Sequence, residues 1–180
     1  MPMKRYGGGG KRRGGGRRRC GGGGAAAGGA QDQVITQWRD TLAKHGRETK
    51  LGTDLCIGYS THIAETEEKA IDEARIFFEE NMKMFAPLGF VRGLSDEQIT
   101  ALASGSSART ASLPTLEDGV KAGSWLCGPA ELVTEKLMDV QSRYPGLEVV
   151  NIGSPVGTPQ KVILEQLERF AKEVMPAFKK

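Results

Sequence analysis

The sequence predicts an α/β fold that corresponds to the C-terminal part of a TIM (β/α)8 barrel. Residues 125–178 show a helix, strand, helix order: Gly128-Pro129 opens a helix, Leu147–Gly153 reads as a buried strand, and Thr158-Pro159 opens another helix. Strands separated by long helical segments indicate parallel pairing. The chain has 180 residues, whereas a complete barrel takes about 250. We therefore expect an incomplete barrel of about two strands and five helices.

The chain divides near residue 30. Residues 1–30 hold thirteen of the 25 glycines and eight of the 25 basic residues, and they hold none of the 22 acidic residues. Such a segment has little to bury and a high ordering entropy, so we expect a disordered Gly/Arg-rich tail before a partial barrel domain at 31–180. The cations of the tail would suit nucleic-acid binding. The alternative is a low-complexity leader, such as a fused reading frame.

Cysteine usage and hydropathy predict a soluble cytoplasmic protein. The three cysteines are widely spaced and form no metal-binding or disulfide pattern. The N-terminus lacks the apolar core of a signal peptide, and no apolar run is long enough to cross a membrane.

The first half of the domain reads as helix, strand, helix, helix. Residues 32–45 have apolar side chains at helical spacing. Residues 51–64 alternate between bulky side chains on one face and small or polar ones on the other. This pattern predicts a strand whose bulky face packs under helices and whose small face lines a barrel interior or a pocket wall. Thr66 is the expected N-cap of a long helix that ends near Pro87. Ser95–Gln98 forms a capping box for a short helix to Ala103, and we expect the polar segment 104–112 to be the most mobile internal loop.

The second half supplies the elements that define the fold class. We expect Pro129 at the first position of a helix, then the strand Leu147–Gly153, then Thr158 as the N-cap of the last helix. The expected core face of this last helix consists of Ile163, Leu167, Phe170 and Val174. Two strands leave both edges of a sheet unpaired, so we also expect self-association through these edges.

Five segments in this order resemble the C-terminal part of the luciferase-like, flavin-dependent monooxygenases. The resemblance covers residues 35–178 and rests on the order and spacing of these segments: Trp38–Gly46, Ile63–Ala70, Ala86–Gly89, Trp125–Pro129 and Phe170–Pro176.

The resemblance implies a TIM barrel that binds reduced FMN or a deazaflavin and uses oxygen to oxidise a small organic substrate. It places Leu55–Ala64 at the seventh barrel strand and Leu147–Gly153 at the eighth. The first six strands, which carry most flavin contacts in the family, have no counterpart. The resemblance therefore implies a flavin oxidoreductase that is truncated and inactive by itself. The alternative is a non-enzymatic nucleic-acid-binding protein that acts through its basic tail.

Barrel sites form at the carboxyl ends of the strands, which makes Ser60, His62 and Asn151 the candidate cofactor-binding residues. A histidine there could bond a flavin edge or act as a general base. The alternative is a histidine that is satisfied inside a packed interior. No metal site and no catalytic residue is indicated.

Three further features have a structural and a functional interpretation. The loop Gly153–Gly157 could offer amides to a phosphate or be a simple turn. Cys127 could have a lowered pKa near a helix start or be a small packed thiol. The carboxylate pairs Glu67/Glu68, Glu79/Glu80 and Glu165/Glu168 are expected on solvated helix faces, and Trp38 and Trp125 are expected to anchor the core.

Overall fold

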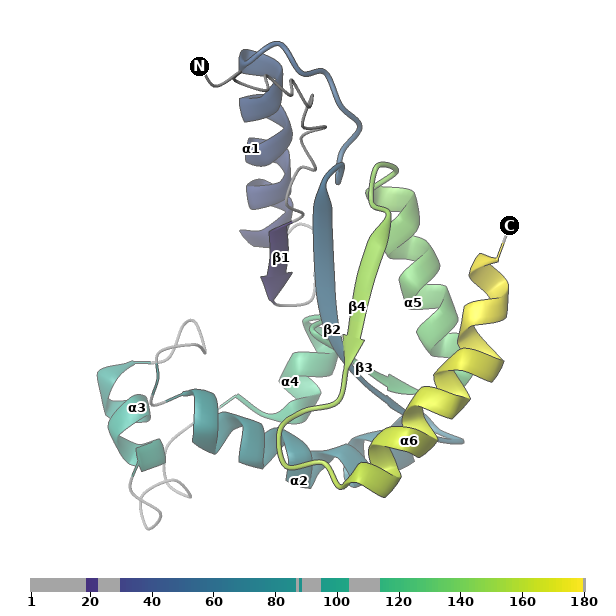
Figure 1. Cartoon of the computed structure of the whole chain (residues 1–180). Helices are drawn as coiled ribbons and strands as arrows, with labels where there is room; N and C mark the ends of the chain where they lie inside the picture. Colours follow the sequence, from purple (N-terminus) through teal and green to yellow (C-terminus); the bar gives the residue numbers. More distant parts are fainter. Residues whose placement is uncertain (1–18, 23–29, 87, 89–94, 104–113, 180) are drawn as a thin grey trace, which may run out of the picture.

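The computed structural model describes residues 19–22, 30–86, 88, 95–103 and 114–179 (Figure 1). The described strands form one parallel sheet: β1 (Arg19–Gly22), β2 (Leu55–Ile63), β3 (Trp125–Gly128) and β4 (Val149–Gly153). The parallel α/β arrangement expected from the sequence is confirmed. The expected number of two strands is too low, because β1 lies in the Gly/Arg-rich segment and β3 is a four-residue strand directly before a helix.

All three other strands pair with β2. β1 pairs with its beginning, β4 with residues 56–60 and β3 with residues 60–63. Consecutive strands of a (β/α)8 barrel pair in chain order, which would place β3 between β2 and β4. In this sheet β4 pairs directly with β2, so the strand order differs from the order of a barrel.

The helices are α1 (Ala30–Lys44), α2 (Glu67–Phe85), α3 (Asp96–Ala103), α4 (Leu116–Lys121), α5 (Ala130–Arg143) and α6 (Gln160–Arg169). The last of these continues into a π-helical turn, η1 (Phe170–Val174), and a 3-10 turn, η2 (Met175–Phe178). The sequence did not predict α4, which begins at a capping box formed by Thr115 and Asp118. The expected mobile loop 104–112 and most of the tail lie outside the described residues.

Two helices begin at the residues expected from the sequence, and two begin differently. Thr66 caps α2 by accepting a hydrogen bond from the Lys69 amide, and Ser95 and Gln98 form the expected capping box at α3. Thr158 does not cap α6, because its hydroxyl donates to the Pro155 carbonyl and the cap position is Pro159. Pro129 is likewise the N-cap of α5 and not its first helical residue.

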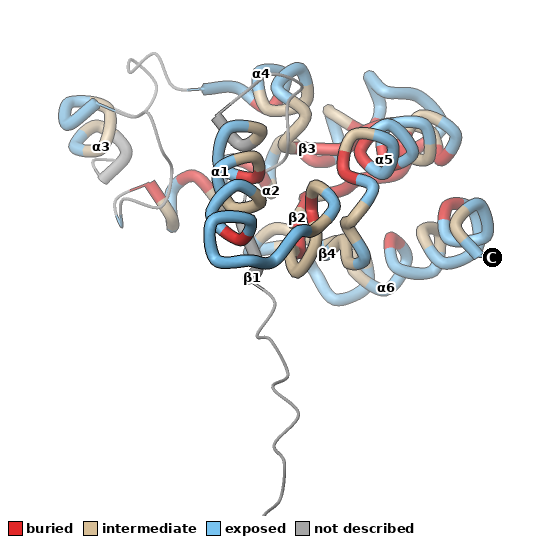
Figure 2. The backbone as a smooth tube through the Cα atoms, turned by 90° about the horizontal axis from the view of Figure 1, so that it is seen from above, coloured by how far each residue is buried: buried red, intermediate tan, exposed pale blue. Residues whose placement is uncertain are grey.

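Helices cover both faces of the sheet. The bulky face of β2 packs with α1, α5 and the C-terminal turns around Ile57, Tyr59, Ile63 and Leu126, as expected. The other face, which we expected to line a barrel interior or a pocket wall, instead packs with α2 and α4 around Trp125 and Cys127. Figure 2 shows the buried residues gathered along β2, β3 and the inner side of α5, whereas most of α1 and α6 is exposed.

The orientation of α6 differs from the expected one. Val174 is fully buried and Ile163 and Phe170 are half-buried, but Leu167 is 51% exposed. The buried residue of this helix is Gln166. The side-chain amide of Gln166 hydrogen-bonds to the backbone of β2, at a helix position where we expected an apolar side chain.

No helix in the described part of the chain has the length and apolar character that a bilayer-spanning segment requires.

Candidate functional site

The sheet register places the three candidate residues on one face. Gly58 pairs with Asn151 and Ser60 pairs with Gly153. Paired residues of parallel strands point to the same side, and residues two apart on one strand also share a side. Ser60, His62 and Asn151 therefore share one face of the β2/β4 sheet, although they are up to 91 residues apart in sequence.

This face is open at β4 and covered at the end of β2. Asn151 is exposed, Ser60 is half-buried and His62 is only 5% exposed. A Cβ atom built on Gly153 would meet no other atom within 4 Å. The open part thus consists of a hydroxyl, an amide and a glycine, and α2 closes the other end.

His62 is held by α2. Its Nε2 lies 3.0 Å from Glu73 Oε2, and its ring lies 6.3 Å from the ring of Phe77. The carboxylate fixes the orientation of the imidazole through its Nε2 atom. The sequence could not reveal this partner, because Glu73 is one of several exposed acids on α2. The geometry is that of a buried histidine with a satisfied hydrogen bond.

Charged side chains continue from Glu73 along the surface of α2. Lys69 Nζ lies 3.7 Å from Glu73 Oε1 and 2.6 Å from Glu65 Oε2. The hydrogen bond between Lys69 and Glu65 raises the pKa of Lys69 and lowers the pKa of Glu65. Both side chains are more than half exposed, so these pairs are screened by solvent and contribute little to stability.

Gln166 completes the backbone hydrogen bonds of β2. The Ile63 amide donates to Gln166 Oε1 at 2.6 Å, and Gln166 Nε2 donates to the Ile63 carbonyl at 3.1 Å. Arg169 Nη1 donates to the same carbonyl at 2.9 Å. A side-chain amide has one donor and one acceptor at the spacing of a strand's backbone, so Gln166 substitutes for a neighbouring strand where β4 has ended.

Cys127 is a packed thiol. It lies in β3, is 2% exposed, and burial together with the nearby Glu67 carboxylate raises its pKa to about 12. A thiol with a raised pKa is a poor nucleophile at neutral pH. The structure therefore supports the packed-thiol interpretation over a thiol with a lowered pKa.

The loop after β4 forms a closed turn. Both the amide and the hydroxyl of Thr158 donate to the Pro155 carbonyl. Gly157 has φ +87°, and a Cβ on it would lie 3.3 Å from Glu80 Cβ, so the loop packs against α2. These contacts favour the turn interpretation over a phosphate site.

The remaining singled-out residues are structural. The paired glutamates are exposed, and Glu80 and Glu168 bond to the neighbouring lysines of their own helices. Trp125 anchors the core as expected and packs edge-on against Phe78 with ring centroids 5.5 Å apart. Trp38 is only half-buried and belongs to neither core cluster, and its Nε1 donates to the Thr53 carbonyl.

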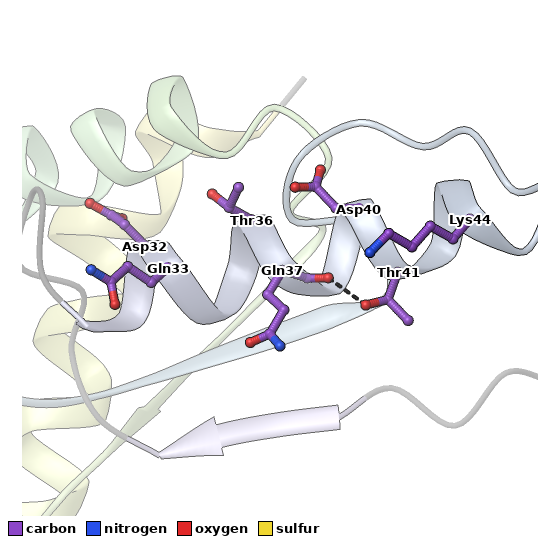
Figure 3. A pocket seen from close by; sticks show the side chains of 7 residues that line it. All are labelled: Asp32, Gln33, Thr36, Gln37, Asp40, Thr41 and Lys44. Carbon is purple, nitrogen blue, oxygen red and sulfur yellow. Dashed lines mark hydrogen bonds between the residues drawn. The ribbon is translucent and has the colours of Figure 1, made fainter.

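Three hollows lie elsewhere on the described surface. One of about 550 Å³ runs along α1 and is lined by polar side chains of that single helix (Figure 3). A second of about 400 Å³ lies between α5, β4 and the C-terminal turns, and a third of about 590 Å³ follows β3. None of these three includes Ser60, His62 or Asn151.

The described residues do not form a complete flavin site. Ser60 and Asn151 offer the donors and acceptors that the polar edge of a flavin ring requires. Asn151 is nevertheless exposed and Gly153 faces open space, so these residues form one wall and not an enclosure. We therefore assign no chemical step to them.

Comparison with known proteins shows similarity of fold. No family model and no curated protein matches the sequence. A monooxygenase from Streptomyces bottropensis matches 82% of this chain with 13% identity and a TM-score of 0.51. The oxygenating constituent of 3,6-diketocamphane monooxygenase from Pseudomonas putida, a type II Baeyer-Villiger enzyme solved in complex with FMN, matches 88% with 17% identity and a TM-score of 0.52.

This chain spans 38% of the Streptomyces protein and 41% of the Pseudomonas protein. At these identities the similarity concerns the fold and does not extend to individual site residues. The nucleic-acid alternative depends on residues 1–30, most of which lie outside the described residues.

Proposed function

We propose that this chain is a C-terminal part of a luciferase-like, flavin-dependent monooxygenase barrel, an enzyme that uses reduced flavin and oxygen on a small organic substrate. The observation that carries the proposal is the match of 88% of the chain to an FMN-bound monooxygenase. The order of the segments that resemble this family supports it independently. The FMN in that neighbour favours FMN over a deazaflavin.

In this proposal the uncovered part of the shared face, at β4, opens toward the rest of a larger protein, while α2 and α4 cover the same face at Trp125 and Cys127. Ser60 and Asn151 line the cofactor or substrate side, where they provide hydrogen bonds. His62 is a positioning residue, because its bond to Glu73 fixes the start of α2 beside this wall. The rest of the flavin site comes from strands other than β1 to β4, so the chain by itself is inactive.

The DNA upstream of Met1 tests this proposal. Read in every frame, it should encode five further βα units before Gln31, because three of the eight strands, β2, β3 and β4, follow Gln31. The longer protein should bind FMN saturably, and Asn151→Leu should weaken that binding. Gln160→Leu is the matched control, because Gln160 is an exposed amide at the start of α6. A longer protein that binds no flavin, or one in which both variants bind equally well, would contradict the assignment.

A further inference from the structure

A hollow of about 400 Å³ lies beside the C-terminal turns, on the other side of the sheet from Ser60 and Asn151. Its floor consists of Val150 and Ile152 of β4. These residues alternate with Asn151 along the strand, so their side chains point to the opposite face. The helix α5 and the turn η1, which lie side by side (Figure 1), border this floor. We name this space the C-terminal hollow.

The interior of the C-terminal hollow is apolar. Its lining side chains come from three parts of the chain: Leu137 of α5, Val150 and Ile152 of β4, and Phe170 and Phe178 near the C-terminus. The four from β4 and the C-terminus are half-buried, because they pack on the core on one side and border the hollow on the other. Removing such apolar surface from water is favourable, so the hollow favours an apolar occupant.

The polar lining residues lie at the rim of the C-terminal hollow. Gln141, Glu148 and Lys179 are all exposed, so their polar groups reach water. The rim carries one carboxylate and one ammonium group, so neither sign of charge is favoured. An ionised ligand would leave water for the apolar interior without a partner there, which is unfavourable. These features favour a neutral occupant.

The π-helical turn η1 brings two lining residues together. The Met175 amide donates to the Phe170 carbonyl, five residues earlier in the chain. In an α-helix, residues five apart lie about 140° apart around the axis, so an uninterrupted helix would direct these two side chains to different sides. The wider turn allows both to line the hollow, while Val174 between them is fully buried in the core. Such turns are rare and occur frequently at functional sites, which is a second reason to expect a ligand here.

We propose that the C-terminal hollow binds one small neutral molecule that contains an aromatic or alicyclic ring. Its volume lies in the range of small-ligand pockets, which begins at about 300 Å³, and Phe170 and Phe178 would pack against the ring. A peptide strand would find no backbone groups to pair with, because Val150 and Ile152 present a face of β4 and not its edge. Two turns of a helix occupy roughly 1,000 Å³ with their side chains, which is more than the hollow offers.

N-Phenyl-1-naphthylamine is a suitable probe, because it is neutral and its fluorescence rises in apolar surroundings. Titration of the purified 180-residue chain should give a saturable rise with one probe bound per chain. Met175→Glu places a carboxylate in the wall of the hollow and should weaken probe binding about tenfold. Met138→Glu is the matched control and should bind like the parent chain, because both methionines are 45% exposed and Met138 lies outside the hollow.

Val150→Phe tests the same hollow from its floor. The larger ring fills part of the space and should also weaken probe binding. Urea denaturation shows whether each variant still folds; Met175 is exposed, so its replacement should leave the fold intact. A parent chain without saturable binding would overturn the proposal, and so would equal affinities of the parent chain and the folded variants of the hollow.

Two further measurements distinguish other occupants. The anionic probe 1-anilinonaphthalene-8-sulfonate should bind no more tightly than the neutral one; tighter binding that is lost in Lys179→Ala would show an anion site and overturn the proposal. Sedimentation equilibrium should find the probe bound to single copies of 19.4 kDa. Binding only to heavier species would mean that a second copy covers the hollow, which would also overturn it. The measurements involve no flavin, so their outcome is independent of the proposed function.

Discussion

Gln166 links the last helix to the central strand. It is the one buried polar residue of α6, and its amide bonds to both backbone groups of Ile63. This role could not be predicted from the sequence, because a lone glutamine in an amphipathic helix usually faces solvent. From the apolar periodicity of this helix we expected Leu167, and not Gln166, to face the interior. A hydrogen bond to a strand edge can outweigh such periodicity, because unpaired buried backbone groups are costly.

Gln166→Ala should lower the free energy of unfolding by about 2 kcal/mol, because it leaves the Ile63 amide buried without its partner. Gln160→Ala removes the same side chain at the exposed start of the same helix, where the expected change is close to zero. Urea denaturation of the two variants and the parent chain measures the difference. Equal losses in the two variants would mean that the Gln166 bonds do not stabilise the sheet.

The buried thiol of Cys127 makes the free energy of unfolding depend on pH in the alkaline range. Its pKa is raised from 9.0 to about 12 in the folded state. Below about pH 9 the thiol is neutral in both states, and its effect on stability does not change with pH. Between about pH 9 and pH 12 the thiol ionises in the unfolded chain but not in the folded one. Stability therefore falls as pH rises, by up to about 1.4 kcal/mol per pH unit.

Cys127→Ala lacks this titration. The difference in the free energy of unfolding between the parent chain and Cys127→Ala should shift by about 1 kcal/mol between pH 8 and pH 10, to the disadvantage of the parent. Chemical denaturation at the two pH values measures the shift. If the difference stays constant, the thiol is not buried as described.

At the scale of elements, local signals predicted five of the six helices, and they missed α4 and the short strand β3. Thr66 and Ser95 act as caps because their hydroxyls reach amides three residues ahead, which is a purely local geometry. β3 has only four residues, too few to show a period, and its last residue, Gly128, forms with Pro129 a pair that is typical of a helix start. Its strand character depends on pairing with β2, which is separated from it by 61 residues of sequence.

Thr66→Ala should cost about 1 kcal/mol of stability, because the Lys69 amide loses its acceptor at the start of α2. Thr41→Ala is a suitable control, since Thr41 is exposed inside α1 and its hydroxyl bonds back to the Gln37 carbonyl. Alanine has the higher helix propensity, so this control should be neutral or slightly stabilising. Thermal or urea denaturation compares the two; a smaller loss for Thr66→Ala than for Thr41→Ala would contradict the capping role.

At the scale of the whole molecule, the sequence predicted a parallel α/β fold and the face that Ser60, His62 and Asn151 share. Alternation along β2 was sufficient to place Ser60 and His62 on one face, and the register between β2 and β4 places Asn151 there as well. Strand order was not predictable, because it depends on which edges meet in three dimensions. The hydrogen-bond partner of His62 was not predictable either, because Glu73 and the other acidic residues of α2 differ only in their position relative to the sheet.

The same arrangement explains why we propose a scaffold without independent catalysis. The shared face is one wall, open at Asn151 and Gly153, and closed only where α2 covers His62. The matched monooxygenases are more than twice as long as this chain. A cofactor enclosed by several strand ends would need more walls than β2 and β4 supply.

The most direct measurement is a titration of the purified 180-residue chain with FMN, followed by flavin fluorescence. The account predicts no saturable quenching, because Ser60 and Asn151 cannot enclose the ring without further strands. Saturable quenching, weakened by Asn151→Leu and unchanged by Gln160→Leu, would contradict it. That result would show that the described face is a complete flavin site by itself.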